Sequence, residues 1–396
     1  MTLFLTSKAN PHEIAGALRR TSNQYEPGMG QPMTMRKLGT TVIALLSSNR
    51  RLARWTASHG RSWLPVSAIP MVMCAVVIAA VAQNQTGKTQ VQSELSPLPY
   101  WAYAADPSPA TSHAEPKFVD GTPQHVQGSE AAFTLSQSGD LFNTPDWHPV
   151  GHPSMPEVVA HGRKPNVYAC GYCHLPNGQG RPENSSLAGL PADYIVQQMA
   201  DFKSGWRKRS DPRLPPITLM IGVAAHADEK EIQAAAAYFS GLKPKAWIRV
   251  VETSAVPQTH VAGRMLVVSE PVVMEPIGQR IIETPENLER TELHDDASGF
   301  IAYVPMGSLK KGEALVMTGG AGKTMQCAAC HGPDLKGLGN VPSIAGRSPS
   351  YIVRQLYDIQ IGARAGAATQ AMKATVEKLT VDDMVSIAAY TASLLP

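Results

Sequence analysis

Cys170-Gly-Tyr-Cys173-His174 and Cys327-Ala-Ala-Cys330-His331 are two copies of one motif, Cys-x-x-Cys-His. The motif is typical of covalent c-type haem attachment. Its two thiols add to the vinyl groups of the porphyrin, and the adjacent histidine reaches the iron from one side. A single copy would also fit half of a zinc site or a redox dithiol. Two copies, with matching sequence after each, favour two covalently bound haem c groups with His174 and His331 on the irons.

The two motifs belong to a longer internal repeat with an offset of 157 residues, so that His174 corresponds to His331. A repeat of this length indicates a duplicated domain rather than a solenoid. The second copy is five residues shorter in a later loop, and beyond that loop Met220 corresponds to Met372. Other matched pairs include Tyr194 with Tyr351 and Arg207 with Arg364.

Met220 and Met372 are the predicted sixth ligands, because a methionine thioether opposite histidine raises the potential of haem iron. The alternative is that both are core methionines, which often fill gaps in packing. Met199 competes with Met220 in the first copy, but it aligns with a leucine and is predicted to pack. His161 and His226 are further alternatives, for which a solvated loop position is favoured.

Each half of the repeat resembles a class I cytochrome c domain, and the whole resembles two-haem cytochromes c of bacteria. The resemblance implies a small helical domain, with one helix before the haem turn and a closing helix that crosses it. It also implies one-electron transfer. The first copy departs from the usual pattern at Leu175, where the second has Gly332. We expect this difference to change the turn below the first haem without removing a ligand.

Hydrophobic spacing predicts helices in both halves. One helix begins with Pro156 at its opening position, where the missing N–H is harmless. The closing helix of the first half begins at Asp228, and Glu231 three residues later completes a capping box. Thr380 and Asp383 hold the equivalent places in the second half. Two further segments have apolar residues along one face, namely Asp193–Phe202 and Tyr351–Ile361.

Arg207 and Arg364 follow equivalent helices in the two halves. A guanidinium group is suited to bidentate pairing with a carboxylate, so each arginine is a candidate partner for a haem propionate. A solvated surface position is the equal alternative.

The N-terminal region is predicted to be a disordered basic leader, residues 1–82. Residues 1–62 carry nine Lys/Arg and two Asp/Glu, whereas the whole chain has a net charge of +3. The basic character is thus confined to the leader, and no nucleic-acid partner is indicated. The apolar run Ile69–Ala82 suits a cleaved signal peptide better than a membrane span, which needs about 20 residues. Extension back to Trp63 leaves an inner-membrane anchor as the alternative. Either way the haem domains are periplasmic.

Residues 83–155 are rich in Pro, Ser, Thr and Ala and predict a flexible tether. His148 and His152 within it could bind metal, although a loop role is favoured. Between the two halves, Trp247–Val251, Met265–Val268 and Gln279–Ile282 predict strands. The chain is therefore expected to be mainly α, with the leader (1–82), the tether (83–155), cytochrome c domain 1 (156–242), a strand-rich insert (243–307) and cytochrome c domain 2 (308–396).

The acidic segment Glu283–Asp296 within the insert is predicted to be a solvated loop. The alternative is a docking surface for a basic partner.

An electron carrier is the favoured function, because methionine and histidine together leave no open position on the iron. Its partners would be a redox donor and a redox acceptor, or a membrane-bound dehydrogenase or oxidase complex of which it is the cytochrome subunit. The alternative is a dihaem enzyme, such as a peroxidase, which requires one open iron. A haem-based sensor is a third class, but the sequence contains no recognisable output domain.

Overall fold

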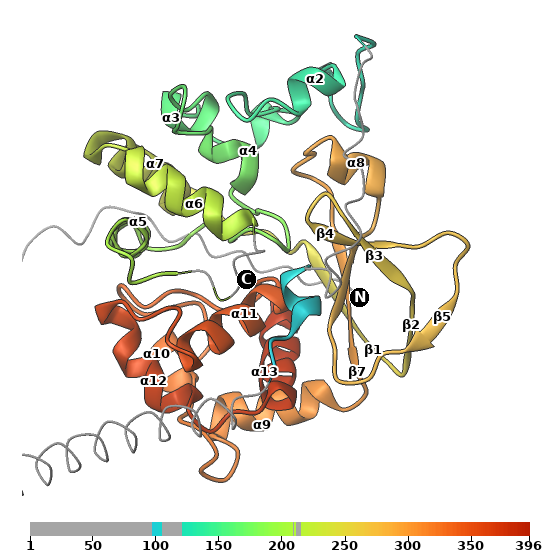
Figure 1. Cartoon of the computed structure of the whole chain (residues 1–396), viewed down its shortest axis with the longest axis vertical. Helices are drawn as coiled ribbons and strands as arrows, with labels where there is room; N and C mark the ends of the chain where they lie inside the picture. Colours follow the sequence, from blue (N-terminus) through green and yellow to red (C-terminus); the bar gives the residue numbers. More distant parts are fainter. Residues whose placement is uncertain (1–96, 105–120, 209, 211–214) are drawn as a thin grey trace, which may run out of the picture. The chain divides into compact units, whose positions relative to one another are not determined.

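The computed structural model describes residues 97–104, 121–208, 210 and 215–396 (Figure 1). These residues belong to one structural unit, Gln85–Pro396. The predicted leader, including the apolar run Ile69–Ala82, lies outside the described residues. Within the described ranges, no helix has both the length and the apolar character that a membrane span requires.

The first cytochrome-like half is helical. Asp228 caps its closing helix: the Asp228 side chain accepts from the backbone N–H of Glu231 at 2.9 Å, and the Glu231 side chain accepts from that of Asp228 at 2.8 Å. The predicted capping box is confirmed. The predicted helix start at Pro156 is one residue too early. Pro156 is the extended N-cap residue, and the first helical residue is Glu157. The helices are α3 (Glu157–Ala160), α4 (Cys170–His174), α5 (Ala192–Lys203), α6 (Pro215–His226) and α7 (Glu229–Gly241).

The second half repeats this plan with a longer opening helix. Thr380 and Asp383 form its capping box as predicted. Its helices are α9 (Ser308–Thr318), α10 (Ala328–His331), α11 (Pro349–Gln360), α12 (Gln370–Val376) and α13 (Val381–Ser393), with a short 3-10 turn η4 (Ala367–Thr369).

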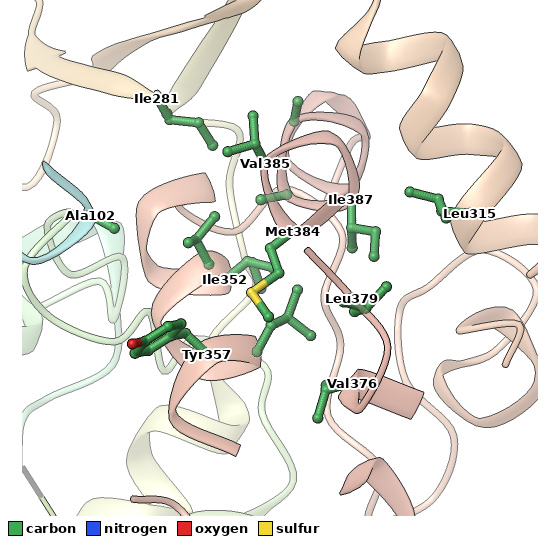
Figure 2. Close-up of a cluster of buried hydrophobic side chains, with 14 of the residues drawn as sticks. Ala102, Ile281, Leu315, Ile352, Tyr357, Val376, Leu379, Met384, Val385 and Ile387 are labelled. Carbon is green, nitrogen blue, oxygen red and sulfur yellow. The ribbon is translucent and has the colours of Figure 1, made fainter. Parts of the chain in front are cut away.

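Apolar side chains of α9, α11 and α13 meet in one core, shown in Figure 2. Met384 of α13, fully buried, lies near the centre of this group. The helices α9 and α13 cross closely at Gly312, where an added Cβ would come within 2.0 Å of the carbonyl oxygen of Ser386. Only glycine permits this approach.

In the sequence, the strand-rich insert separates the two halves, and Figure 1 draws it in gold. A three-stranded sheet has the order β1-β7-β6, with β1 parallel to β7, and two antiparallel pairs join β2 to β5 and β3 to β4. The elements are β1 (Ile248–Thr253), β2 (Ala255–Pro257), β3 (Thr259–Ala262), β4 (Met265–Val268), β5 (Met274–Pro276), β6 (Ile282–Pro285), α8 (Leu288–Glu292) and β7 (Phe300–Pro305).

The predicted strand Met265–Val268 is confirmed with those bounds. The strand predicted over Trp247–Val251 begins one residue later, and the one predicted over Gln279–Ile282 begins only at its last residue. Strand β7 was not predicted, although Phe300, Ala302 and Val304 alternate with more exposed residues and are buried. This alternation is the pattern of a half-buried strand.

Parts of the predicted tether are packed. Residues Tyr100–Tyr103 form the 3-10 turn η2, and Ala102 and Tyr103 enter the core around α11 and α13. Trp147 is 1% exposed and packs against Leu293 of the insert. Composition predicted a flexible tether over residues 83–155. The described residues of this range instead pack against the rest of the fold through buried aromatic side chains. Two short elements lie in this region as well, α2 (Leu135–Ser138) and the 3-10 turn η3 (Pro149–Gly151).

The acidic segment of the insert is buried at both ends, which corrects the predicted solvated loop. Glu283, Asp295 and Asp296 are 2%, 1% and 6% exposed. Glu283 accepts hydrogen bonds from the hydroxyls of Ser348 and Ser350 at the start of α11. The buried carboxylates thus fasten the insert to its neighbours.

Candidate haem sites

Both Cys-x-x-Cys-His motifs form a single helical turn. The four cysteines form no disulfide with one another, and Cys330 is exposed. Burial raises the pKa of the Cys170 thiol to about 12 and that of Cys327 to about 11. Redox-active Cys-x-x-Cys pairs have lowered pKa values instead. The buried environments of Cys170 and Cys327 thus differ from those of redox-active pairs.

The motif histidines are oriented identically in the two halves. Nδ1 of His174 lies 2.7 Å from the carbonyl oxygen of Ser185, and Nδ1 of His331 lies 2.7 Å from that of Pro342. A carbonyl can only accept, so Nδ1 carries the proton and Nε2 keeps its lone pair. Burial lowers the pKa of both imidazoles, which favours the neutral form. A neutral ring fixed through one nitrogen is the state that ligates metal through the other.

The residue after each motif has the same backbone conformation. Leu175 has φ 62° and ψ 153°, and Gly332 has φ 85° and ψ 156°. The expected change of the turn at Leu175 is therefore wrong. Leucine adopts a conformation that is otherwise almost confined to glycine, and its side chain is 2% exposed. Burial of this side chain offsets the backbone strain.

A cavity lies beside α4, with about 820 Å³ of empty space that is partly open to solvent. Cys170, Cys173, His174, Met199 and Met220 all line it. The predicted attachment thiols, the histidine and the predicted methionine of the first half thus share one cavity. The lining also includes Met199, which packs with the core of this half. The cavity alone does not separate the two methionines.

In the second half, Met372 lies on α12 and is half-buried against the core that Cys327 also contacts. His331 is 7% exposed, like His174. The alternative ligands of the first half, His161 and His226, are both exposed. Nδ1 of His226 is occupied by the carbonyl oxygen of Gly222 at 2.8 Å.

The loop after the first motif is tied to the insert. Nδ2 of Asn177 donates to the carbonyl of Asp296 at 2.6 Å, and Nε2 of Gln179 donates to that of Ser298 at 2.9 Å. The ring of Tyr172, inside the motif, lies 4.4 Å from the ring of His294. The sequence contained no signal for these contacts, because they join segments more than a hundred residues apart.

Arg207 and Arg364 are buried, each 8% exposed, so the surface alternative is wrong for both. Arg207 donates to Gln198 of its own half at 3.1 Å and to Gln355 of the other at 2.9 Å. Arg364 donates to Gln355 at 3.1 Å and to Gln198 at 2.8 Å.

The rest of this interface is equally symmetric. Arg207 donates to the hydroxyl of Tyr351 at 3.3 Å, and Arg364 donates to that of Tyr194 at 2.8 Å. The backbone N–H of Lys208 donates to Ala363, and that of Ala365 donates to Trp206. Each of these bonds is the counterpart of the other under the 157-residue repeat.

Haem fits this environment. A second cavity shares His174 and Met220 with the first and is lined also by Arg207 and Tyr351. Within the described residues, neither Arg207 nor Arg364 forms an ion pair with a carboxylate, and Nε of Arg364 has no hydrogen-bond partner. Buried charges normally have partners, and the carboxylates of haem would supply them.

Comparison with known proteins places the chain in a family. Residues 312–390 match the family model described as cytochrome C oxidase, cbb3-type, subunit III. Over 75 residues the chain is 33% identical to cytochrome c-554(548) of Halomonas halodenitrificans, which covers 19% of this chain and 90% of that protein. Over 234 residues it is 25% identical to the thiosulfate dehydrogenase electron acceptor of Thiomonas intermedia, covering 58% of this chain and 80% of the relative.

The structure of reduced recombinant cytochrome c4 from Pseudomonas stutzeri aligns with 57% of this chain and 93% of its own, at 21% identity and a TM-score of 0.38. On the sequence match to cytochrome c-554(548), the chain belongs to the cytochrome c family. Members of this family hold haem c covalently and act as electron carriers for redox partners.

Proposed function

We propose that this protein is an exported cytochrome with two haem c groups that passes single electrons between redox partners of a respiratory chain. The observation that supports it best is the repeated histidine geometry. His174 and His331 each fix Nδ1 on a carbonyl at the same repeat position and leave Nε2 free beside two thiols. Two sites built alike point to the same cofactor in both.

In this proposal, Cys170 and Cys173 attach one haem, and Cys327 and Cys330 attach the other. His174 and His331 would each hold a haem iron through Nε2. When bound, haem iron supplies the one-electron couple. Met220 and Met372 would supply thioether sulfur to the same irons, which favours the reduced state and would leave no position for a substrate.

Arg207 serves the first site by placing positive charge at the cavity that His174 lines. Arg364 has the equivalent place in the second half, where its charge, after burial, contributes to the lowered pKa of His331. Each guanidinium would hold a haem carboxylate and keep its charge compensated inside the interface. The interface would thereby hold both cofactors in register.

The electron donor is inferred from one relative, which is named as the electron acceptor of thiosulfate dehydrogenase. We infer a dehydrogenase as donor for this chain and a terminal oxidase or another carrier as acceptor. The protein would act in the periplasm, either alone or as the cytochrome subunit of a membrane-associated complex. Stopped-flow reduction by candidate dehydrogenases, with the chain otherwise pure, identifies the donor.

The test of the proposal counts covalent haem. After acid–acetone extraction the full chain is expected to retain two haems by pyridine haemochrome assay. Cys170→Ala with Cys173→Ala should leave one haem, and Cys327→Ala with Cys330→Ala should leave the other. Complete loss of porphyrin on extraction would refute the proposal. A high-spin ferric spectrum from one haem in the unmodified chain would instead favour the enzyme alternative.

A further inference from the structure

Three side chains outside the haem sites converge beside the insert. Nε2 of His148 lies 2.9 Å from Oδ1 of Asp295 and 3.9 Å from Oδ1 of Asp296. All three ligand atoms lie within 4.8 Å of one another. The histidine comes from the segment before the first haem half, and the two carboxylates come from the insert, where Asp295 follows His148 by 147 residues. One imidazole and two carboxylates thus face a common point.

Buried packing holds both sides of this cluster in place. Trp147, next to His148, is 1% exposed and donates its Nε1–H to the carbonyl oxygen of Leu293 at 2.8 Å. Leu293, two residues before Asp295, is 3% exposed and packs against the same tryptophan. The cluster is therefore prearranged by the fold and does not depend on mobile side chains meeting by chance.

The two carboxylates differ in how their charge is compensated. Asp295 is fully engaged: its Oδ2 accepts from Nε of Arg290 at 2.5 Å, and its Oδ1 accepts from the backbone N–H of Ala297 at 2.9 Å. Asp296 is 6% exposed, and its Oδ1 has no hydrogen-bond partner. That unpartnered oxygen is directed towards His148. A buried carboxylate oxygen without a partner is costly.

The spacing of these atoms suits a small cation. Bonds of about 2.0–2.2 Å in a tetrahedral zinc site place neighbouring ligand atoms about 3.4 Å apart. Nε2 of His148 lies 2.9 Å from Oδ1 of Asp295 and 3.9 Å from Oδ1 of Asp296, and these two distances bracket that value. Small rotations of the side chains would make the two distances equal. His148 and Asp296 also line a cavity next to the sheet, together with the amide side chains of Asn177 and Gln179. Water in that cavity can complete the coordination.

We propose that His148, Asp295 and Asp296 bind one divalent first-row transition-metal ion, separate from the haem irons. Ca²⁺ and Mg²⁺ prefer all-oxygen sites, whereas mixed imidazole and carboxylate donors suit Zn²⁺ and its neighbours. Arg290 already compensates Asp295, so a dication would compensate Asp296 and replace the hydrogen bond between His148 and Asp295. The ion would pin the segment before the first haem half to the insert.

Burial and the nearby charge of Asp295 raise the pKa of Asp296. Uptake of a proton by Asp296 is therefore the competing way to satisfy this carboxylate. The two explanations differ in one measurable respect, because only the first requires stoichiometric metal binding at neutral pH.

Zn²⁺ binding to the haem-loaded full chain tests the proposal. After treatment with a chelator and buffer exchange, isothermal titration is expected to show one tight zinc site per chain. Asp296→Asn and His148→Ala should each weaken it at least about 100-fold, more than the loss of an outer-shell partner. The matched variants His125→Ala and Asp140→Asn, which change exposed residues of the same segment, should bind as the unmodified chain does. Zinc-edge X-ray absorption should show nitrogen and oxygen ligands at about 2.0–2.2 Å.

Two results would overturn the proposal. One is the absence of stoichiometric zinc uptake by a chain that carries its full haem content. The other is uptake that Asp296→Asn leaves unchanged, since this near-isosteric variant keeps the fold and removes only the charge. Near-ultraviolet circular dichroism confirms that both variants are folded, so that a loss of binding is assigned to the site.

Discussion

Arg207 and Arg364, 157 residues apart in the sequence, are equivalent members of one buried hydrogen-bond network. Each guanidinium group donates to the same two glutamines, Gln198 and Gln355. The duplicated halves therefore meet through residues that the duplication itself supplied in pairs.

This shared network makes the two arginines energetically coupled. Arg207→Lys and Arg364→Lys each lose the planar fork and leave buried acceptors unsatisfied, so each should destabilise the chain by about 1–3 kcal/mol. The double variant should depart from additivity by at least about 0.5 kcal/mol, because the acceptors are common to both. Thermal unfolding of the four proteins completes the cycle. Arg249 forms an exposed ion pair with Glu286, so the control variant Arg249→Lys should change stability by less than about 0.5 kcal/mol. Strict additivity of the effects of Arg207→Lys and Arg364→Lys would contradict the network.

The first iron offers a direct choice between two methionines that line one cavity. Met220→Leu should abolish the near-infrared charge-transfer band of one ferric haem and lower its reduction potential, because the thioether raises that potential. Met199→Leu should leave both the band and the potential unchanged. Met372→Leu should affect the other haem alone. Redox titration followed by absorbance checks all three, and the reverse pattern for Met199 and Met220 would reassign the ligand.

Two helical glycines should respond in opposite ways to alanine. In Gly312→Ala the new methyl would lie 2.0 Å from the carbonyl oxygen of Ser386, so α9 and α13 must separate, at a cost of about 1–3 kcal/mol or more. For Gly222 in α6, no heavy atom of the described residues lies within 4 Å of the added Cβ, apart from its chain neighbours and the backbone of its own helix. Gly222→Ala should therefore stabilise by about 0.5–1 kcal/mol through helix propensity. Chemical denaturation of both variants measures the difference, and equal effects would be inconsistent with the close crossing.

The ion pairs of Asp383 should make the stability of the fold sensitive to acid. Although burial opposes it, ion pairs with Lys311 at 2.8 Å and Lys323 at 2.9 Å hold the pKa of Asp383 well below its usual 3.8. Because the folded pKa is depressed, this stabilisation is fully present above pH 3.8 and is lost as the pH falls below that value. Asp383→Asn should cost about 1–2 kcal/mol at neutral pH through the weakened cap, and much less near pH 2.

Unfolding midpoints of the two proteins, measured across this pH range, test the sign. The neighbouring variant Asp382→Asn, whose side chain is 42% exposed, serves as the control and should have little effect. A gap between Asp383→Asn and the unmodified chain that widens on acidification would show that the assigned linkage is reversed.

Local signals in the sequence were sufficient where one segment determines its own structure. The capping boxes at Asp228 and Thr380 and the strand Met265–Val268 are examples, since a cap or a short apolar run needs no distant partner. Position along the repeat was equally informative for His174 and His331, which adopt the same orientation.

Features that depend on tertiary contacts were missed or misplaced. Glu283, Asp295 and Asp296 looked like a solvated acidic loop, because nothing nearby in sequence shows that Ser348, Ser350 or His148 would meet them. The interface role of the arginine pair was hidden for the same reason, since each partner lies in the other half. A pattern of charged residues predicts solvent exposure only when the segments that pack against those residues are known.

The pairing of β1 and β6 with the central strand β7 governs how the polypeptide path can be altered. Val251 of β1 and Ile282 of β6 are both opposite Tyr303 of β7, so the chain leaves the sheet for the hairpins after β1 and returns in β6 at the same end of the sheet. Proteolysis at the exposed residues Val272–Met274 would cleave the backbone, but the two fragments would stay associated, because β1 remains hydrogen-bonded to β7. A foreign module could therefore be grafted at that end of the sheet in place of the hairpins, with the three-stranded sheet left intact.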